Sequence, residues 1–107
     1  MKKKLTTSGS GWEIYLAKPI LKLMGINPKS SQVLFRIEKR ELIIKEIKPC
    51  ELESYQNSMI RKFTKSGSGY ALYISNTILE LLDINPIEDY IEYELNDNVL
   101  TIRKIEN

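Results

Sequence analysis

The sequence predicts a mainly β fold with short helices, built from two tandem repeats that share one core. The first observation is an internal repeat, because residues 4–12 reappear as residues 62–70 and the offset of 58 continues without a gap. Between 4–47 and 62–105, 16 of 44 positions are identical. The second observation is that apolar and polar residues alternate over short runs, which is typical of half-buried strands.

The repeat divides the chain into repeat 1 at residues 1–47, a linker at 48–60 and repeat 2 at 61–107. The linker is polar and shows no clean period. A unit as small as one repeat can bury only a thin core and is marginal alone. We therefore expect the two repeats to pack together.

Each repeat begins with two strands and a short helix. A strand is expected at 5–7 and a loop at 8–11, where Ser-Gly-Ser-Gly has turn chemistry. Alternation predicts a strand at 12–16. Pro19 suits the first turn of a helix, and Gly25 suits its left-handed C-terminal cap. Asp83 takes the place of Gly25 in repeat 2 and tolerates that conformation less well.

Each repeat ends with a hairpin. Alternating residues predict strands at 33–37 and 91–95, and closing strands at 42–44 and 99–102. The two-residue segments between them, 39–40 and 97–98, are expected to be hairpin turns.

Composition excludes several classes of protein. The chain lacks histidine, which excludes His-based triads, metal sites and proton switches, and Cys50 is its single cysteine, which excludes internal disulfides and multi-Cys zinc sites. No carboxylate pair, phosphate loop or metal cluster has usable spacing, so we expect neither a cofactor nor enzymatic activity. The apolar runs are too short to span a bilayer, and no secretory signal is recognisable, so we expect a soluble, cytoplasmic protein.

Charge is divided unevenly along the chain, although the net charge is only +2. Residues 1–50 contain 11 basic and 4 acidic residues, a net +7, whereas residues 51–107 contain 5 and 10, a net −5. Such a division indicates a charged partner surface.

The ordered motifs of both repeats together resemble one known family. These motifs are the Lys-Leu-Thr-Thr-Ser-Gly-Ser-Gly-Trp run at 4–12, the short helix ending Leu-Met-Gly-Ile-Asn-Pro at 23–28, and the hairpin closing Leu-Ile-Ile-Lys at 42–45. They are similar to the AbrB/MazE/SpoVT family of swapped-hairpin DNA-binding domains, which are usually homodimers. The resemblance implies a swapped-hairpin AbrB-type β-barrel, formed as a pseudo-dimer by the two repeats of one chain.

The resemblance also implies a function. Family members mostly regulate transcription or form the DNA-binding part of antitoxins, so the expected partner is duplex DNA. Family members bind DNA through the first strands and following loops of both halves. The matching residues here are Lys2, Lys3, Lys4, Thr7, Ser10, Arg61, Lys62, Lys65 and Ser68.

The chain departs from the family at some of these positions. Many members have a basic residue in place of Thr7, and arginine in place of Tyr15 and Tyr73. Arginine is the side chain best suited to bidentate reading of guanine, so we expect either weak sequence-specific recognition here or recognition through a different set of contacts.

Two alternatives stay open. One is an antitoxin or inhibitor that binds a cognate toxin or another basic enzyme, such as a nuclease, through the acidic second hairpin, although such a face is more often merely solvated. The acidic residues are Glu88, Asp89, Glu92, Glu94 and Asp97. The other is a homodimer of two pseudo-dimeric chains, through Tyr15, Tyr73 or the linker; otherwise we expect a monomer.

Overall fold

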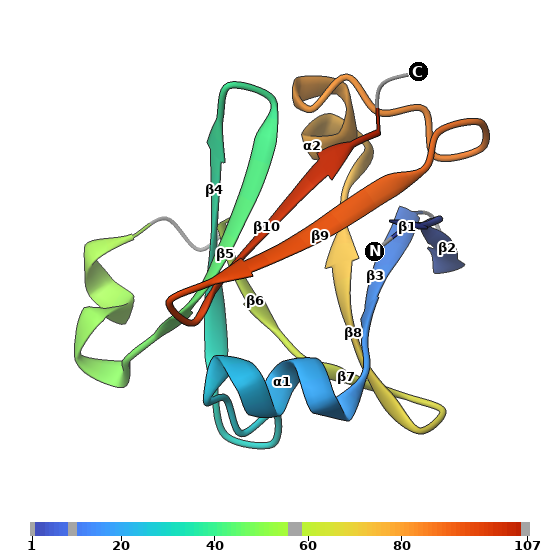
Figure 1. The fold of residues 1–107 in the computed structure, drawn as a ribbon. Helices are drawn as coiled ribbons and strands as arrows, with labels where there is room; N and C mark the ends of the chain where they lie inside the picture. Colours follow the sequence, from blue (N-terminus) through green and yellow to red (C-terminus); the bar gives the residue numbers. More distant parts are fainter. Residues whose placement is uncertain (1, 9–10, 56–58, 106–107) are drawn as a thin grey trace.

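The described part of the chain forms two antiparallel sheets and two short α-helices (Figure 1). The computed structural model describes residues 2–8, 11–55 and 59–105. The six-stranded sheet has the order β1-β9-β10-β5-β4-β6, and the four-stranded sheet has the order β2-β3-β8-β7. The strands are β1 (Lys2–Lys3), β2 (Thr6–Ser8), β3 (Gly11–Leu16), β4 (Gln32–Glu38), β5 (Glu41–Ile47), β6 (Ile60–Lys62), β7 (Thr64–Ser66), β8 (Gly69–Ile74), β9 (Ile91–Asn96) and β10 (Val99–Lys104).

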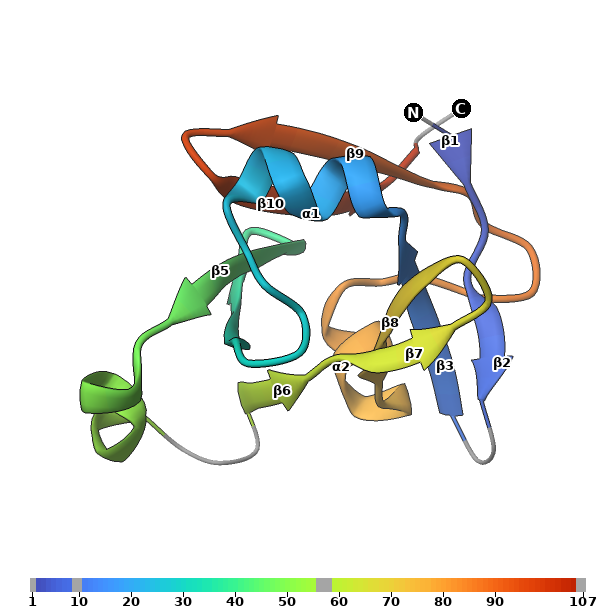
Figure 2. The same ribbon diagram turned by 90° about the horizontal axis from the view of Figure 1, so that it is seen from below.

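Between the strands, the residues that the structure describes form two α-helices and one 3-10 helix. The α-helices are α1 (Lys18–Met24) and α2 (Asn76–Leu81). In the linker, Pro49–Ser54 forms a 3-10 helix, η1, which projects from one side of the molecule (Figure 2). None of the described helices is long and apolar enough to cross a membrane.

The pairing of strands between the repeats is symmetric: it stays the same when the two repeats are interchanged. In the four-stranded sheet Ile14 pairs with Leu72, and in the six-stranded sheet Ile43 pairs with Thr101. Both pairs join positions that are 58 residues apart, so exchanging the repeats leaves both pairings unchanged. The repeats therefore meet through equivalent strands in each sheet.

The first strand of each repeat pairs with the hairpin of the other repeat. Lys3 of β1 lies opposite Ile91 of β9, and Arg61 of β6 lies opposite Val33 of β4. The offset of 58 converts one pair into the other. Each hairpin is therefore extended by a strand that belongs to the other repeat.

The expectation of a barrel is corrected by this arrangement, because the described residues form two sheets and no closed barrel. The physical reason lies at Leu5 and Phe63, where the first strand of each repeat is interrupted and passes from one sheet to the other. Leu5 is buried, and Phe63 packs against the core. The inward turn of these side chains breaks the ladder that a closed barrel would need.

One apolar cluster fills the space between the sheets and takes residues from both repeats. The inward-facing residues at the pairings between the repeats are fully buried, as Ile14, Leu72, Ile44 and Leu100 illustrate. Their burial on the inner faces of both sheets explains why period-2 alternation identified the strands.

The local signals in the sequence are confirmed. Gly25 ends α1 with φ 71°, and Asp83 adopts φ 58° at the equivalent position after α2. Both predicted hairpin turns have positive φ at both residues, which matches the right-handed twist of the strands. Asp97 and Asn98 tolerate this conformation better than Lys39 and Arg40 do.

Two tyrosines cross between the repeats and cover glycines. A Cβ on Gly69 would lie 2.5 Å from Tyr15 Oη, and a Cβ on Gly11 would lie 2.5 Å from Tyr73 Oη. These contacts are again equivalent at an offset of 58. The last glycine of each Ser-Gly-Ser-Gly run is thus needed because an aromatic ring of the other repeat occupies the place of its side chain.

Candidate nucleic-acid interface

Two cations of the first strands, Lys3 and Arg61, contact aromatic rings within the protein. Lys3 Nζ lies 5.5 Å from the centre of the Tyr15 ring and 5.6 Å from that of Tyr93. At the equivalent place in the other repeat, Arg61 Cζ lies 5.0 Å from the centre of the Phe35 ring. These distances are typical of cation–π contacts, so both cations stabilise the attachment of their strand to the neighbouring hairpin.

In the same two regions, the equivalent backbone carbonyls of Tyr15 and Tyr73 accept hydrogen bonds from different kinds of side chain. The Tyr93 hydroxyl donates to the carbonyl oxygen of Tyr15 at 3.0 Å, and burial raises the pKa of Tyr93 above its usual value. Phe35 has no hydroxyl, and Arg61 Nε donates to the Tyr73 carbonyl instead, at 3.1 Å. Partial burial lowers the pKa of Arg61. Arg61 therefore has a packing and hydrogen-bonding role.

The other predicted positions differ in their contacts. Lys4, Thr7 and Lys62 are all exposed, and Lys4 Nζ also donates to the Ile87 carbonyl at 2.9 Å. The backbone of Lys2 lies in β1. Ser68 is exposed, and its hydroxyl lies 3.3 Å from Tyr15 Oη. The predicted position Ser10 lies outside the described residues.

The structure places Lys65 in a groove with three lysines that the sequence analysis did not select. This groove, of about 420 Å³, lies between α1, the turn that follows it, and strands β7 and β8. We call it the basic groove and define it by its charged lining residues, Lys18, Lys22, Lys29 and Lys65. Three of them come from repeat 1 and Lys65 comes from repeat 2, so the groove is formed by both repeats.

Local sequence explains the positions of these lysines. Lys18 and Lys22 are one helical turn apart on α1 and so project on the same side. After Gly25 reverses the chain, Ile26 N donates to the Leu21 carbonyl at 3.1 Å, as in a Schellman motif. Lys29 N then donates to Asn27 Oδ1 at 3.0 Å, which brings Lys29 back beside the helix.

Lys65 reaches the groove from the neighbouring sheet. It pairs with Tyr70 across β7 and β8, and its Nζ lies 5.1 Å from the centre of the Tyr70 ring. Within the described part of the chain, none of the four ammonium groups of the basic groove forms an ion pair. Four cations without a carboxylate partner around one concavity form a surface that attracts polyanions.

At the place in repeat 2 that corresponds to the basic groove, the structure has a groove of unlike charge. It is about 400 Å³ in volume, and we call it the acidic groove. Its charged lining residues are Glu80, Asp83, Glu88, Asp89 and Lys104. Lys104 Nζ lies 3.3 Å from Asp83 Oδ2, so one cation offsets part of the negative charge.

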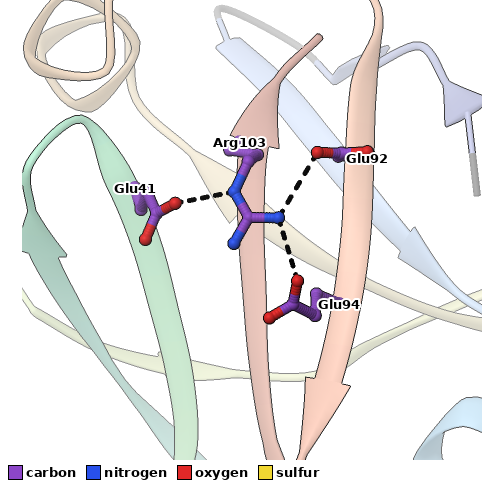
Figure 3. Close-up of polar contacts among 4 residues, drawn as sticks. All are labelled: Glu41, Glu92, Glu94 and Arg103. Carbon is purple, nitrogen blue, oxygen red and sulfur yellow. Dashed lines mark hydrogen bonds and ion pairs between the residues drawn. The ribbon is translucent and has the colours of Figure 1, made fainter.

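The acidic second hairpin is partly neutralised by one arginine. Figure 3 shows Arg103 between three carboxylates: Nε donates to Glu41 at 2.6 Å, and Nη1 donates to Glu92 at 3.3 Å and to Glu94 at 3.2 Å. These contacts, led by Glu41, raise the pKa of Arg103 above its usual value. Two of the five acids predicted to bind a basic enzyme therefore face a cation of their own hairpin.

The remaining acids of that set are scattered. Asp89 Oδ2 accepts from the backbone N–H of Asn85 at 2.7 Å, while Glu88 and Asp97 are exposed in separate loops. The described residues contain no group of His, Cys, Asp or Glu side chains that could hold a metal ion.

Comparison with known proteins adds no relative, because no family model, curated protein or solved structure matches the chain significantly.

Proposed function

We propose that the chain is a cytoplasmic DNA-binding transcriptional regulator of the AbrB type, whose two repeats form a swapped-hairpin pseudo-dimer. The observation that carries this proposal is the basic groove, where four lysines from both repeats line one concavity without ion-pair partners among the described residues. Duplex DNA presents a dense row of phosphates that such a groove attracts.

The strand exchange supports the family assignment within this proposal. In a swapped-hairpin domain, segments of one half complete the sheet of the other half. The pairing of β1 with β9 and of β6 with β4 has this character. Predicted resemblance and observed pairing thus favour the same architecture.

The chemistry of the groove indicates how DNA would be bound. Lysine acts on phosphate as a mobile point charge, whereas arginine reads base edges through its planar fork. The described residues that line the groove include lysine and no arginine. Binding should therefore depend strongly on salt and rest mainly on the phosphate backbone.

The protein-binding alternative has less support. It requires the acids of the second hairpin to form one exposed face, and Arg103 already bonds to Glu92 and Glu94. A basic enzyme would have to displace this arginine or bind acids that lie in separate loops. We retain duplex DNA as the proposed partner.

The test is duplex binding by fluorescence anisotropy between about 50 and 200 mM NaCl. Each phosphate contact contributes about −0.9 to the slope of log K against log salt, so four lysines predict about −3.6. A variant that neutralises the repeat 1 part of the groove should reduce the steepness of that slope by about 2.7. Its substitutions are Lys18→Gln, Lys22→Gln and Lys29→Gln.

A matched control removes the same charge elsewhere. Its substitutions are Lys39→Gln, Lys45→Gln and Lys48→Gln, which lie outside the lining of the groove. Circular dichroism verifies that each variant is folded. Absence of binding by the unmodified chain at the lowest salt would overturn the proposed function. An equal loss of duplex affinity in both variants would show that the basic groove is not the DNA-binding surface.

A further inference from the structure

The two grooves have the same backbone geometry. After α1, Ile26 N donates to Leu21 O at 3.1 Å, and after α2, Ile84 N donates to Leu79 O at 3.0 Å. The following turns also agree, because Lys29 N donates to Asn27 Oδ1 and Ile87 N donates to Asn85 Oδ1, each at 3.0 Å. A ligand that recognises backbone shape would therefore find two similar sites.

Side-chain charge distinguishes the two repeats at the four positions of the lysines, and one of the four equivalent residues, Glu80, lines the acidic groove. The offset of 58 relates Lys18 to Asn76, Lys22 to Glu80, Lys29 to Ile87 and Lys65 to Thr7. Each lysine of the basic groove is thus replaced by a neutral or acidic residue. Asp83, Glu88 and Asp89 add negative charge to the acidic groove where repeat 1 has Gly25, Ser30 and Ser31.

We infer that the chain binds the phosphate backbone through the basic groove alone, and that the acidic groove is held away from DNA by like-charge repulsion. This inference rests on the proposed function and adds that only one of the two grooves binds DNA. In a symmetric homodimer both equivalent grooves would contribute equally. Here one chain offers a single phosphate-binding groove, although it contains two copies of the fold unit.

The equivalent positions provide an internal control for a direct test. The isotope-labelled chain is titrated with a short DNA duplex, and the amide chemical shifts are followed by NMR. The amide resonances of Lys22 and Lys29 should shift. Their equivalents Glu80 and Ile87 should remain unchanged. Comparable shifts in both grooves would overturn the inference while leaving DNA binding intact.

A gain-of-function variant tests the repulsion. Three substitutions place repeat 1 residues in the acidic groove or in the exposed turn beside it, and they raise the net charge by four: Glu80→Lys, Asp83→Gly and Ile87→Lys. Two new lysines should make the salt slope steeper by about 1.8 and increase duplex affinity. The matched control, Glu51→Lys with Glu53→Lys, raises the charge equally on η1.

The outcomes separate the two proposals. A larger gain in the groove variant than in the η1 variant supports one-sided binding. Equal gains overturn it, because only net charge would then matter. Failure of the unmodified chain to bind duplex DNA at low salt would overturn the proposed function, and this inference with it.

Discussion

The tyrosine–glycine contacts between the repeats predict unequal effects of two equivalent substitutions. In Gly11→Ala, the three heavy atoms nearest to the new Cβ would all belong to the Tyr73 side chain, with Cε1 and Oη at 2.5 Å and Cζ at 2.7 Å. Tyr73 is 41% exposed, so its ring can swing into solvent. The expected cost is about 1 kcal/mol of unfolding free energy, near the low end for overpacking.

Gly69→Ala should cost more. Its Cβ would lie 2.5 Å from Tyr15 Oη and also 2.8 Å from the backbone oxygen of Leu16. Tyr15 is held by Lys3 and by Ser68, and the Leu16 carbonyl cannot move without displacing β3. We expect a loss of about 3 kcal/mol, at the upper end of the overpacking range.

Double-mutant cycles identify the cause. In a Tyr73→Ala background these three closest contacts at Gly11 disappear, so the cost of Gly11→Ala should fall from about 1 kcal/mol to near zero. In a Tyr15→Ala background, Gly69→Ala should remain destabilising because the Leu16 oxygen is still present. Urea unfolding followed by circular dichroism is the suitable assay, since Trp12 fluorescence would report directly on the mutated neighbour. If Gly11→Ala costs the same with and without the Tyr73 ring, the proposed packing is refuted.

Two further predictions concern groups in which the repeats differ. Tyr93→Phe removes the hydrogen bond to Tyr15 and should cost about 1 kcal/mol at pH 7. Burial raises the pKa of Tyr93 above its ordinary 10.0, so above that pH the unfolded state ionises first and the wild type loses up to about 1.4 kcal/mol per pH unit. Urea unfolding should show the difference between wild type and variant closing and then reversing as pH rises above about 10; a pH-independent difference would disprove the assigned burial. Asp83→Gly should stabilise by about 0.5 kcal/mol, because glycine adopts φ 58° without strain and the exposed ion pairs of Asp83 contribute little. The gain should grow in 1 M salt, and destabilisation there would contradict the strain argument.

Local structure was accessible from sequence because its determinants are local. The Pro19 start and Gly25 end of α1, and the two-residue turn at 97–98, depend on residues adjacent in the chain. The pairing of β1 with β9 was not accessible in the same way. It joins Lys3 to Ile91 through a strand of two residues, too short to show a period.

The neutralising role of Arg103 could have been derived from the predicted turn. A two-residue turn at 97–98 places Asn96 opposite Val99, and counting outward places Glu92 opposite Arg103. The register alone would have placed a cation beside Glu92 of the acidic hairpin. The contribution of Glu41, from the other repeat, required the pairing of β5 with β10.

The basic groove was missed for a different reason. Its lysines come from a helix, a turn and a strand of the other repeat, and no single window contains them. The signal in the sequence was the difference in charge between equivalent positions, such as Lys22 and Glu80. Aligning the repeats for their differences, as well as their identities, would have identified these residues.

Fusion of two repeats in one chain explains how the grooves could become unlike. Positions such as Ile14 and Leu72 bury each other across the repeat interface, so both must remain apolar. Lys22 and Glu80 face solvent in separate grooves and have no such mutual constraint. In a symmetric dimer of identical chains, any substitution appears in both grooves at once. A single chain can keep one groove basic and make the other acidic, and the one-groove binding inferred above depends on this freedom.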